Sequence, residues 1–312
     1  MNEQTKIEIN LSSSALSHGG CMLELYRTIV QGYKEPRPTA AMVYGVAVHK
    51  YREVMFKTKG HILTATKAAM DAFRIPKEDN YKSQHLSDEK HMITTAFNYW
   101  EMYVSKDSGF DYLELNGVPA VELSFSLPYY EDDRFRVNLA GTLDGLGKIK
   151  GGCFSIADLK TTSSWDDKNY FKSYELSCQL RFYRFVLSLM AERFPDSILG
   201  KVGATNVGAF IDALFIKPAA NENKYKRSEV FQFSDAHMRE FKVTLDRFIE
   251  HMCHAFQNPE SLTREGILTK ACIKGYGKLC VFFNVCANDE SGKLLLTRDF
   301  IQKPFDPLHY SD

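Results

Sequence analysis

The chain has 312 residues, of which 44% are hydrophobic and 25% are charged. This balance is typical of globular proteins and excludes the disordered, collagen-like and coiled-coil classes. Lysine and arginine together number 39, as do aspartate and glutamate, so the formal net charge is zero. A neutral total does not exclude a nucleic-acid partner, because a local cleft can be basic on a neutral protein.

Length and hydropathy limit the architecture further. At about 150 residues per domain, the chain is long enough for two domains or for one large domain with appendages. No apolar run approaches the roughly 20 residues that span a bilayer, and the polar start lacks the apolar core of a signal peptide. We therefore expect an intracellular, cytoplasmic protein with no membrane partner.

The first third of the chain is predicted to be mostly helical. A serine run at residues 12–14 is a typical helix cap, and Gly32 with the Pro-Arg-Pro segment after it predicts the end of the first helix. The predicted helices cover residues 11–34, 39–57, 61–74 and 86–106.

The pattern changes to strands near residue 118. Alternating apolar residues predict strands over 118–127, 135–146, 153–161, 207–217 and 228–233. A hairpin turn with Gly147, Gly151 and Gly152 would join the second strand to the third. Helices are predicted over 168–194 and, with Ser234 as the cap, over 234–257, and the tail from Asn258 is expected to be irregular. The order β-β-β-α-β-β predicts a mixed α/β core with helices before and after it.

Two aspartates and a lysine form the central chemical pattern. Asp158 and Lys160 lie two apart on a predicted strand, so their side chains point to the same face, and a hairpin would bring Asp144 near them. Two carboxylates in one space repel unless a cation lies between them, and oxygen ligands suit Mg²⁺ or Mn²⁺. The alternative is a surface ion pair on an edge strand. It is disfavoured because the strand is apolar on both faces and buried charges are costly.

Two helical pairs add weaker signals. His49 and Glu53 are four residues apart on one predicted helix, as are Gln179 and Tyr183 on another, so each pair shares a face. Imidazole is a common metal ligand, and amide and phenol groups hydrogen-bond phosphates or metal-bound water. Taken alone, the first pair is more often a packed histidine than a ligand, and the second fits an ordinary amphipathic helix.

Four motifs stand in chain order: Gly45-x3-His49-x3-Glu53, Gly141-x2-Asp144, Asp158-x-Lys160-Thr161 and Gln179-x3-Tyr183. Together they resemble the RecB-like branch of the PD-(D/E)XK nuclease superfamily, which includes Cas4-like proteins, the AddB nuclease domain and many phage exonucleases. The resemblance covers roughly residues 21–286. It departs from the superfamily name at Ala157, where a proline would precede the aspartate.

The resemblance implies a PD-(D/E)XK, restriction-endonuclease-like α/β core over residues 118–257. A helical N-terminal part over 1–117 and a cysteine-bearing segment over 258–312 would complete one integrated nuclease domain. The implied metal ligands for Mg²⁺ or Mn²⁺ are His49, Asp144, Asp158 and the backbone carbonyl of Leu159. Lys160 would assist the attacking water, and Gln179 and Tyr183 would organise the site and the DNA. Glu122 and Glu53 are candidate secondary carboxylates.

Cysteine spacing predicts a second metal site. Seven cysteines are too few, and odd in number, for a disulfide scaffold, and clustering near the C-terminus in a reducing compartment favours a metal. The resemblance implies a [4Fe–4S] cluster held by Cys21, Cys272, Cys280 and Cys286, although the gap between the second and third is wider than in many relatives. Zinc is the alternative, and His18 could replace one thiolate. Free buried cysteines are expected at positions 153, 178 and 253.

The resemblance implies metal-dependent hydrolysis of DNA that leaves a 5′-phosphate. The expected protein is an exonuclease acting on single-stranded DNA or duplex ends, in recombination, repair or phage DNA processing, in a bacterial or phage-infected cell. The alternatives are an iron–sulfur DNA-binding or adaptor subunit that recruits a helicase, recombinase or integrase, and a structure-specific endonuclease. Four basic residues near the motifs fit DNA-backbone contacts and a solvated helix face equally well: Lys50, Arg52, Arg181 and Arg184.

Overall fold

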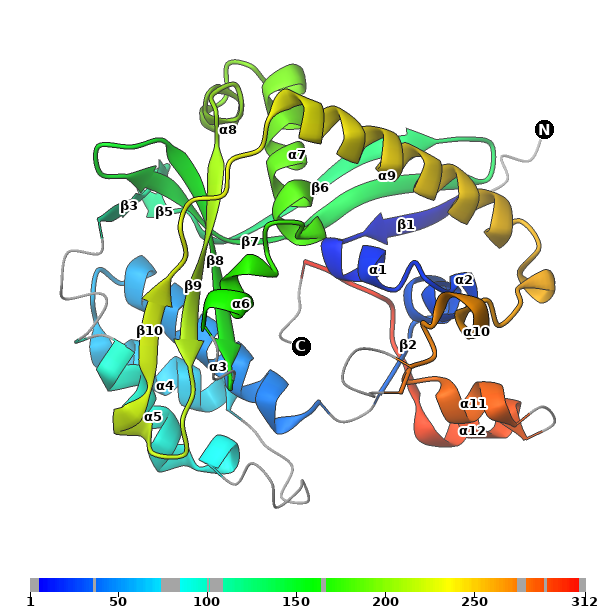
Figure 1. Ribbon diagram of the computed structural model, residues 1–312, viewed down its shortest axis with the longest axis horizontal. Helices are drawn as coiled ribbons and strands as arrows, with labels where there is room; N and C mark the ends of the chain where they lie inside the picture. The colour runs from blue at the N-terminus through cyan, green and yellow to red at the C-terminus, as the bar shows by residue number, and fades with distance from the viewer. Residues whose placement is uncertain are drawn as a thin grey trace.

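The computed structural model describes residues 6–35, 38–73, 85–99, 101, 109–163, 167–273, 279–288 and 291–308. A mixed central sheet carries helices on both of its faces, so the chain has an α/β fold (Figure 1). One buried cluster lies between the sheet and α7 and α9, and another lies between the sheet and α3, α4 and α5. The coarse expectation of a mixed α/β architecture is confirmed.

Seven strands of the described residues form the central sheet, in which β1, β7, β8, β9 and β10 are neighbours in that order and β3 and β6 also pair with β7. Their bounds are β1 Ile7–Leu11, β3 Phe110–Tyr112, β6 Val121–Glu131, β7 Phe135–Ile149, β8 Phe154–Thr162, β9 Gly208–Phe215 and β10 Lys224–Arg227. The β1–β7 and β8–β9 pairs are parallel and the others are antiparallel. Gly147 lies inside β7, where β3 passes too close for a side chain, and not in the hairpin turn as predicted.

The longest helices begin at side-chain caps. Thr39 caps α3 (Ala40–Lys57), Ser177 caps α7 (Cys178–Arg193), and Ser234 caps α9 (Asp235–Phe256), each accepting a hydrogen bond from a backbone N–H of the first turn. α4 (Ile62–Ala72) and α5 (Glu89–Tyr99) lie within their predicted ranges, and residue 74 of the first range and residues 100 and 102–106 of the second lie outside the described residues. No helix in the described part of the chain is long and apolar enough to cross a membrane.

The single helix predicted over residues 11–34 is wrong. The segment contains the end of β1, then α1 (Ser13–Ser17), α2 (Met22–Leu25), the π-helical turn η1 (Tyr26–Val30) and β2 (Tyr33–Lys34). Gly19 and Gly20 separate α1 from α2, and an added Cβ at Gly19 would meet the ring of Phe248 on α9. Close packing against α9 therefore favours two short helices over one long one.

Two further predictions in the core are wrong. The helix predicted over 168–194 is divided into α6 (Asp167–Lys172) and α7, because the Ser177 hydroxyl accepts from the Leu180 N–H at 3.4 Å and starts a new helix. The last strand of the central sheet in chain order is β10 at 224–227, whereas residues 228–233 form no strand and contribute a bridge between Phe231 and Ala209. The strand predicted over 118–127 is divided into β5 (Val118–Pro119) and β6, and the elements absent from the prediction include β1, β3, β4 (Glu114–Leu115) and α8 (Ile198–Gly203).

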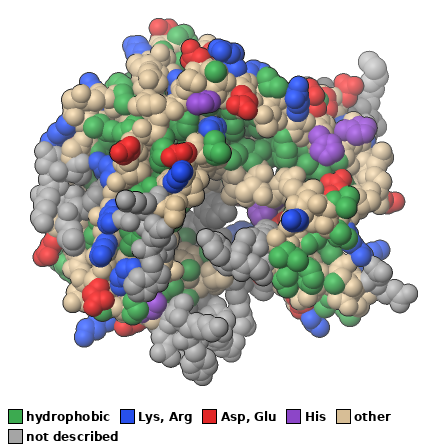
Figure 2. All heavy atoms as spheres, viewed as in Figure 1, with side chains coloured by type: hydrophobic (Ala, Val, Ile, Leu, Met, Phe, Trp, Pro, Cys, Tyr) green, Lys and Arg blue, Asp and Glu red, His purple; other side chains and the backbone are tan. Residues whose placement is uncertain are grey.

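The C-terminal tail is more regular than predicted. It contains α10 (Gly266–Thr269), α11 (Phe283–Ala287), α12 (Gly292–Asp299) and β11 (Ile301–Gln302), which pairs with β2. Its buried apolar residues form a small cluster of Cys280, Phe282 and Val285. Hydrophobic side chains gather on the exposed face of this lobe (Figure 2). The lobe has little core of its own, so contacts with the N-terminal segment have to hold it in place.

Candidate metal centre

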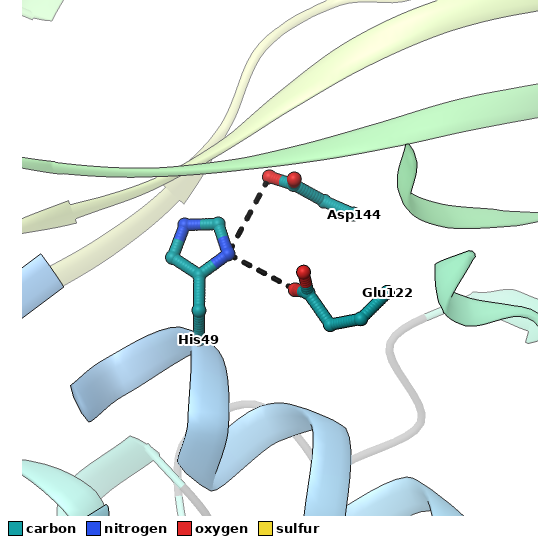
Figure 3. Close-up of side chains that lie close together, drawn as sticks. All are labelled: His49, Glu122 and Asp144. Atoms are coloured by element: carbon teal, nitrogen blue, oxygen red, sulfur yellow. Dashed lines mark hydrogen bonds and ion pairs between the residues drawn. The ribbon is translucent and has the colours of Figure 1, made fainter. Parts of the chain in front are cut away.

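Three side chains from three elements converge on one point (Figure 3). His49 comes from α3, Glu122 from β6 and Asp144 from β7. His49 Nδ1 lies 3.0 Å from Glu122 Oε1 and 3.8 Å from Asp144 Oδ2. Within the described ranges, no other set of three or more His, Cys, Asp or Glu side chains has its ligand atoms within 4.8 Å of one another. The sequence placed His49 and Asp144 in the site and Glu122 only among secondary candidates.

A close contact between helix and strand positions His49. An added Cβ at Gly45 would lie 3.2 Å from Thr161 Oγ1 of β8, so a larger residue there would push α3 away from the strand. One helical turn later, His49 Nε2 lies 3.1 Å from the carbonyl oxygen of Leu159, also on β8. The Gly-x3-His spacing therefore has a physical cause: the glycine lets α3 lie close to β8, and this short distance lets the histidine contact the β8 backbone.

Glu122 has an unusual backbone conformation. The β6–β7 register pairs Val121 with Gly145 and Leu123 with Leu143, which places Glu122 opposite Asp144. The φ angle of Glu122 is 48°. A non-glycine residue in this left-handed region costs about 1–2 kcal/mol, and such strain is concentrated at functional sites. The backbone thus marks Glu122 independently of its side-chain contacts.

The hydrogen-bond partners of His49 favour a cation at Nδ1. The Leu159 carbonyl oxygen can only accept, so the hydrogen bond at Nε2 places the proton of the neutral ring there. Nδ1 is then an acceptor that faces the carboxylates of Glu122 and Asp144. Burial opposes protonation of the ring, but these two carboxylates outweigh it and raise the pKa of His49. Three acceptors converge stably only around a proton or a metal ion.

Asp158 and Lys160 form an ion pair beside this group. Lys160 Nζ lies 2.8 Å from Asp158 Oδ2, and the Asp158 side chain is 1% exposed. Apart from this ion pair, neither carboxylate oxygen of Asp158 has a hydrogen-bond partner among the described residues. Burial raises the pKa of Asp158, and the opposing charge of Lys160 does not fully offset this. A buried carboxylate with one partner is stabilised by a further cation.

The backbone of β8 joins the two halves of the site. Leu159 donates its N–H to Asp144 Oδ2 at 2.8 Å, while its carbonyl faces His49. The β7–β8 register pairs Leu146 with Ile156, and its continuation by two residues places Asp144 opposite Asp158. The expected convergence of Asp144, Asp158 and Lys160 is therefore present.

The predicted Gln179–Tyr183 pair lies on α7 next to the carboxylates. Gln179 Nε2 donates to Tyr183 Oη at 3.1 Å, and the Tyr183 ring packs edge-on against Phe125. Burial raises the pKa of Tyr183, and the charges of Asp144 and Asp158 raise it further. The phenol is thus held in its protonated, hydrogen-bonding form beside the site.

The neighbouring charged residues have structural partners. Glu53 accepts hydrogen bonds from Lys50 and Lys57 at 2.8 Å each, and it is not part of the convergent group. Arg184 donates to two backbone carbonyl oxygens, one at the last residue of α8 and one just after this helix. Arg52 is 0% exposed, so both interpretations of Arg52, as a DNA-backbone contact and as part of a solvated helix face, are wrong. Its guanidinium instead donates to the Asp144 carbonyl oxygen and lies 3.5 Å from Glu122 Oε1.

We expect Arg52→Met to lower the free energy of unfolding by about 3 kcal/mol, because it removes the buried cation that holds the Asp144 carbonyl and Glu122. Urea denaturation measures this. Arg181→Met is the control, since Arg181 is only half-buried on α7 and donates to one carbonyl. Its expected change is within about 0.5 kcal/mol. Equal stability of both variants would contradict a structural role for Arg52.

The cysteines from the two ends of the chain meet around one pocket, whose lining includes Cys21, Cys272, Cys280 and Cys286. Burial raises the pKa of Cys272, and Cys21 and Cys286 add to this because their thiols lie nearby. An added Cβ at Gly266 would lie 2.9 Å from Cys272 Sγ, so the glycine leaves the space that the sulfur occupies. The expected grouping of these residues is therefore present.

The other candidate residues lie elsewhere. His18 Nδ1 is 2.8 Å from Glu24 Oε1, and His18 is not among the pocket-lining residues. Cys253 is buried and Cys153 half-buried, but Cys178 is exposed at the start of α7, so the expectation of a buried thiol there is wrong.

Comparison of the sequence with models of known protein families gives no match, and comparison with curated proteins gives none either. The function therefore has to be argued from the two groups of side chains.

Proposed function

We propose that the chain is a metal-dependent deoxyribonuclease of the PD-(D/E)XK type, in its RecB-like branch, and that it degrades DNA from ends. The observation that carries the proposal is the convergence of His49, Glu122 and Asp144 next to the buried Asp158–Lys160 pair. An acidic group with one histidine and one lysine can hold a divalent cation and place a positive charge beside a phosphate, which suits metal-assisted phosphodiester hydrolysis.

His49, Glu122 and Asp144 would hold the divalent cation, with Asp158 and the Leu159 carbonyl beside them. Oxygen donors with a single imidazole suit Mg²⁺ or Mn²⁺ better than thiophilic ions. Such an ion polarises a phosphate oxygen and makes bound water more acidic. The Asp158 carboxylate, which has no partner besides Lys160 among the described residues, and the acceptor-only surroundings of His49 Nδ1 both fit a cation of this kind.

Lys160 supplies a positive charge at the reacting phosphate. Burial opposes the charged form, but Asp158 and Asp144 outweigh it and raise the pKa of Lys160, so the side chain is an ammonium at neutral pH. It therefore donates hydrogen bonds to the attacking water or to the phosphate oxygens. Because the ammonium is already protonated, a carboxylate of the site has to take the proton of the water. Gln179 and Tyr183 offer an amide and a phenol for orienting the DNA backbone.

End-labelled linear DNA incubated with the protein and Mn²⁺ tests the proposal. We expect release of labelled fragments by the wild type and none by Asp158→Asn. A closed circular single strand should resist degradation, because an exonuclease needs an end. Cutting of the circle would replace the exonuclease proposal with an endonuclease. Absence of cleavage, or equal cleavage by Asp158→Asn, would contradict the nuclease itself.

An adaptor function is the second candidate. It is favoured by the cysteine-bearing lobe with its apolar surface, which the hydrolytic site does not require. In that case binding to DNA, or to a helicase, recombinase or integrase, would survive Lys160→Ala and account for the biological role. The intact ion pair at Lys160 favours hydrolysis, because a scaffold gains nothing from a costly buried charge.

We further propose that Cys21, Cys272, Cys280 and Cys286 hold a [4Fe–4S] cluster. Around one zinc ion, with Zn–S near 2.3 Å, the sulfurs would lie about 3.8 Å apart. In the described residues no three cysteine sulfurs lie within 4.8 Å of one another, which fits a larger group. The bound group would tie the C-terminal lobe to α2 and thereby contribute to folding.

A further inference from the structure

Arg27 directs its guanidinium at the cysteine group. It lies on η1, directly after α2, whose N-cap residue is Cys21. Arg27 Nη1 donates a hydrogen bond to Cys286 Sγ at 3.2 Å, and its guanidinium carbon lies 5.5 Å from the centre of the Phe282 ring. Phe282 is 1% exposed and stacks on Phe300, so the arginine rests on a fixed surface. Two contacts therefore fix the Arg27 side chain, one with a sulfur atom and one with an aromatic ring.

The chemistry of this contact favours a thiolate. Arginine stays protonated and has no acceptor, so the sulfur accepts with a lone pair. A set of four thiolates carries a large negative charge, and Arg27 is a cation at hydrogen-bond distance from one of them. Glu24 lines the same pocket; its carboxylate is 2.8 Å from His18 Nδ1, and its charge is also one of the smaller causes that raise the pKa of Cys272. Arg264 also lines the pocket, so basic groups accompany the cysteines.

The turn that carries Arg27 is itself unusual. The Gln31 N–H bonds to the Tyr26 carbonyl oxygen at 3.0 Å, the five-residue spacing of a π-helix. Such turns are rare in proteins, and those that occur are often found at functional sites. They change the direction of side chains relative to a regular α-helix. In this chain the rotated segment is the one that reaches Cys286.

We propose that Arg27 is a positioning residue for the metal group of the four cysteines: it holds the Cys286 thiolate and raises the reduction potential of the bound cluster. Hydrogen bonds and positive charge at the sulfurs stabilise the more negative, reduced state. This inference rests on the proposed iron–sulfur site and is independent of DNA hydrolysis.

The test compares anaerobically purified wild type, Arg27→Met and Arg27→Lys in a dithionite titration followed by visible absorption. Arg27→Met keeps the length of the stem and removes the charge. We expect the equilibrium constant for reduction to fall at least tenfold, which is about 59 mV for a one-electron couple. Arg27→Lys should lie between Arg27→Met and the wild type. Arg298→Met is the control, because Arg298 is exposed in the same lobe and pairs with Asp299; it should not change the potential.

An unchanged potential in Arg27→Met would overturn the inference alone. A wild type that contains zinc or no metal would overturn it together with the iron–sulfur proposal, while DNA cleavage would still report on the nuclease separately. Loading of Arg27→Lys but not of Arg27→Met would support the requirement for charge. Failure of both variants to bind iron would reduce Arg27 to a structural role and overturn the inference.

Discussion

Replacement of Lys160 by methionine is expected to reduce DNA hydrolysis by about 10³-fold, because the ammonium that stabilises the charge developing at the phosphate is lost. The same change should lower the free energy of unfolding by about 3 kcal/mol, since it leaves the buried carboxylate of Asp158 without its one ion-pair partner among the described residues. Rates on end-labelled DNA and urea denaturation measure the two effects separately.

The double variant Asp158→Asn/Lys160→Met separates chemistry from folding. Removing both charges should restore most of the lost stability, because replacing a buried ion pair with neutral groups is often tolerated. Activity should stay at the level of the less active single variant, since a ligand candidate and the cation are both absent. Recovery of activity in the double variant would contradict the roles given to these residues, and so would full activity of Lys160→Met alone.

Serine at any of the positions 21, 272, 280 or 286 should abolish the brown colour that we expect from the proposed [4Fe–4S] cluster and should destabilise the C-terminal lobe. The lobe has a small buried cluster, so its attachment depends on the bound group. The expected loss of stability is at least 2 kcal/mol, on the order of that caused by loss of a structural cross-link. Iron and sulfide analysis with thermal unfolding measures both effects.

Cys178→Ser is the matched control for these variants. Cys178 is exposed on α7 and outside the pocket, so its replacement should leave both colour and melting temperature unchanged. Colourless wild-type protein with one zinc per chain would replace the cluster with a zinc site. Full iron content in Cys286→Ser would remove Cys286 from the ligand set.

Local sequence patterns were sufficient to place much of the metal centre. The helical pattern over 39–57 placed His49 on one face of a helix, and the hairpin predicted between two neighbouring strands brought Asp144 near Asp158. These signals are reliable because each depends on residues close in sequence. The pairing of β1 with β7 joins residues more than 120 apart, and the five-residue alternation at 7–11 is too short to reveal it.

Glu122 shows the limit of this approach. The register that places it opposite Asp144 follows from the hairpin and could have been derived, but its positive φ depends on the surrounding packing. Arg52 shows the opposite error, because a basic residue beside a motif looks like a DNA contact until its burial is known. Tertiary contacts, which periodicity does not record, decide both cases.

The most direct test of the chelating site is Mn²⁺ binding to the protein in the absence of DNA. The loss of the electron paramagnetic resonance signal of free Mn²⁺ measures this binding. We expect one saturable site in the wild type and no measurable binding by Asp144→Asn or Glu122→Gln, because each change removes a proposed ligand. Glu53→Gln, whose carboxylate pairs with lysines on the surface of α3, should bind like the wild type. Absence of saturable binding by the wild type, or equal binding by Asp144→Asn, would contradict the metal centre.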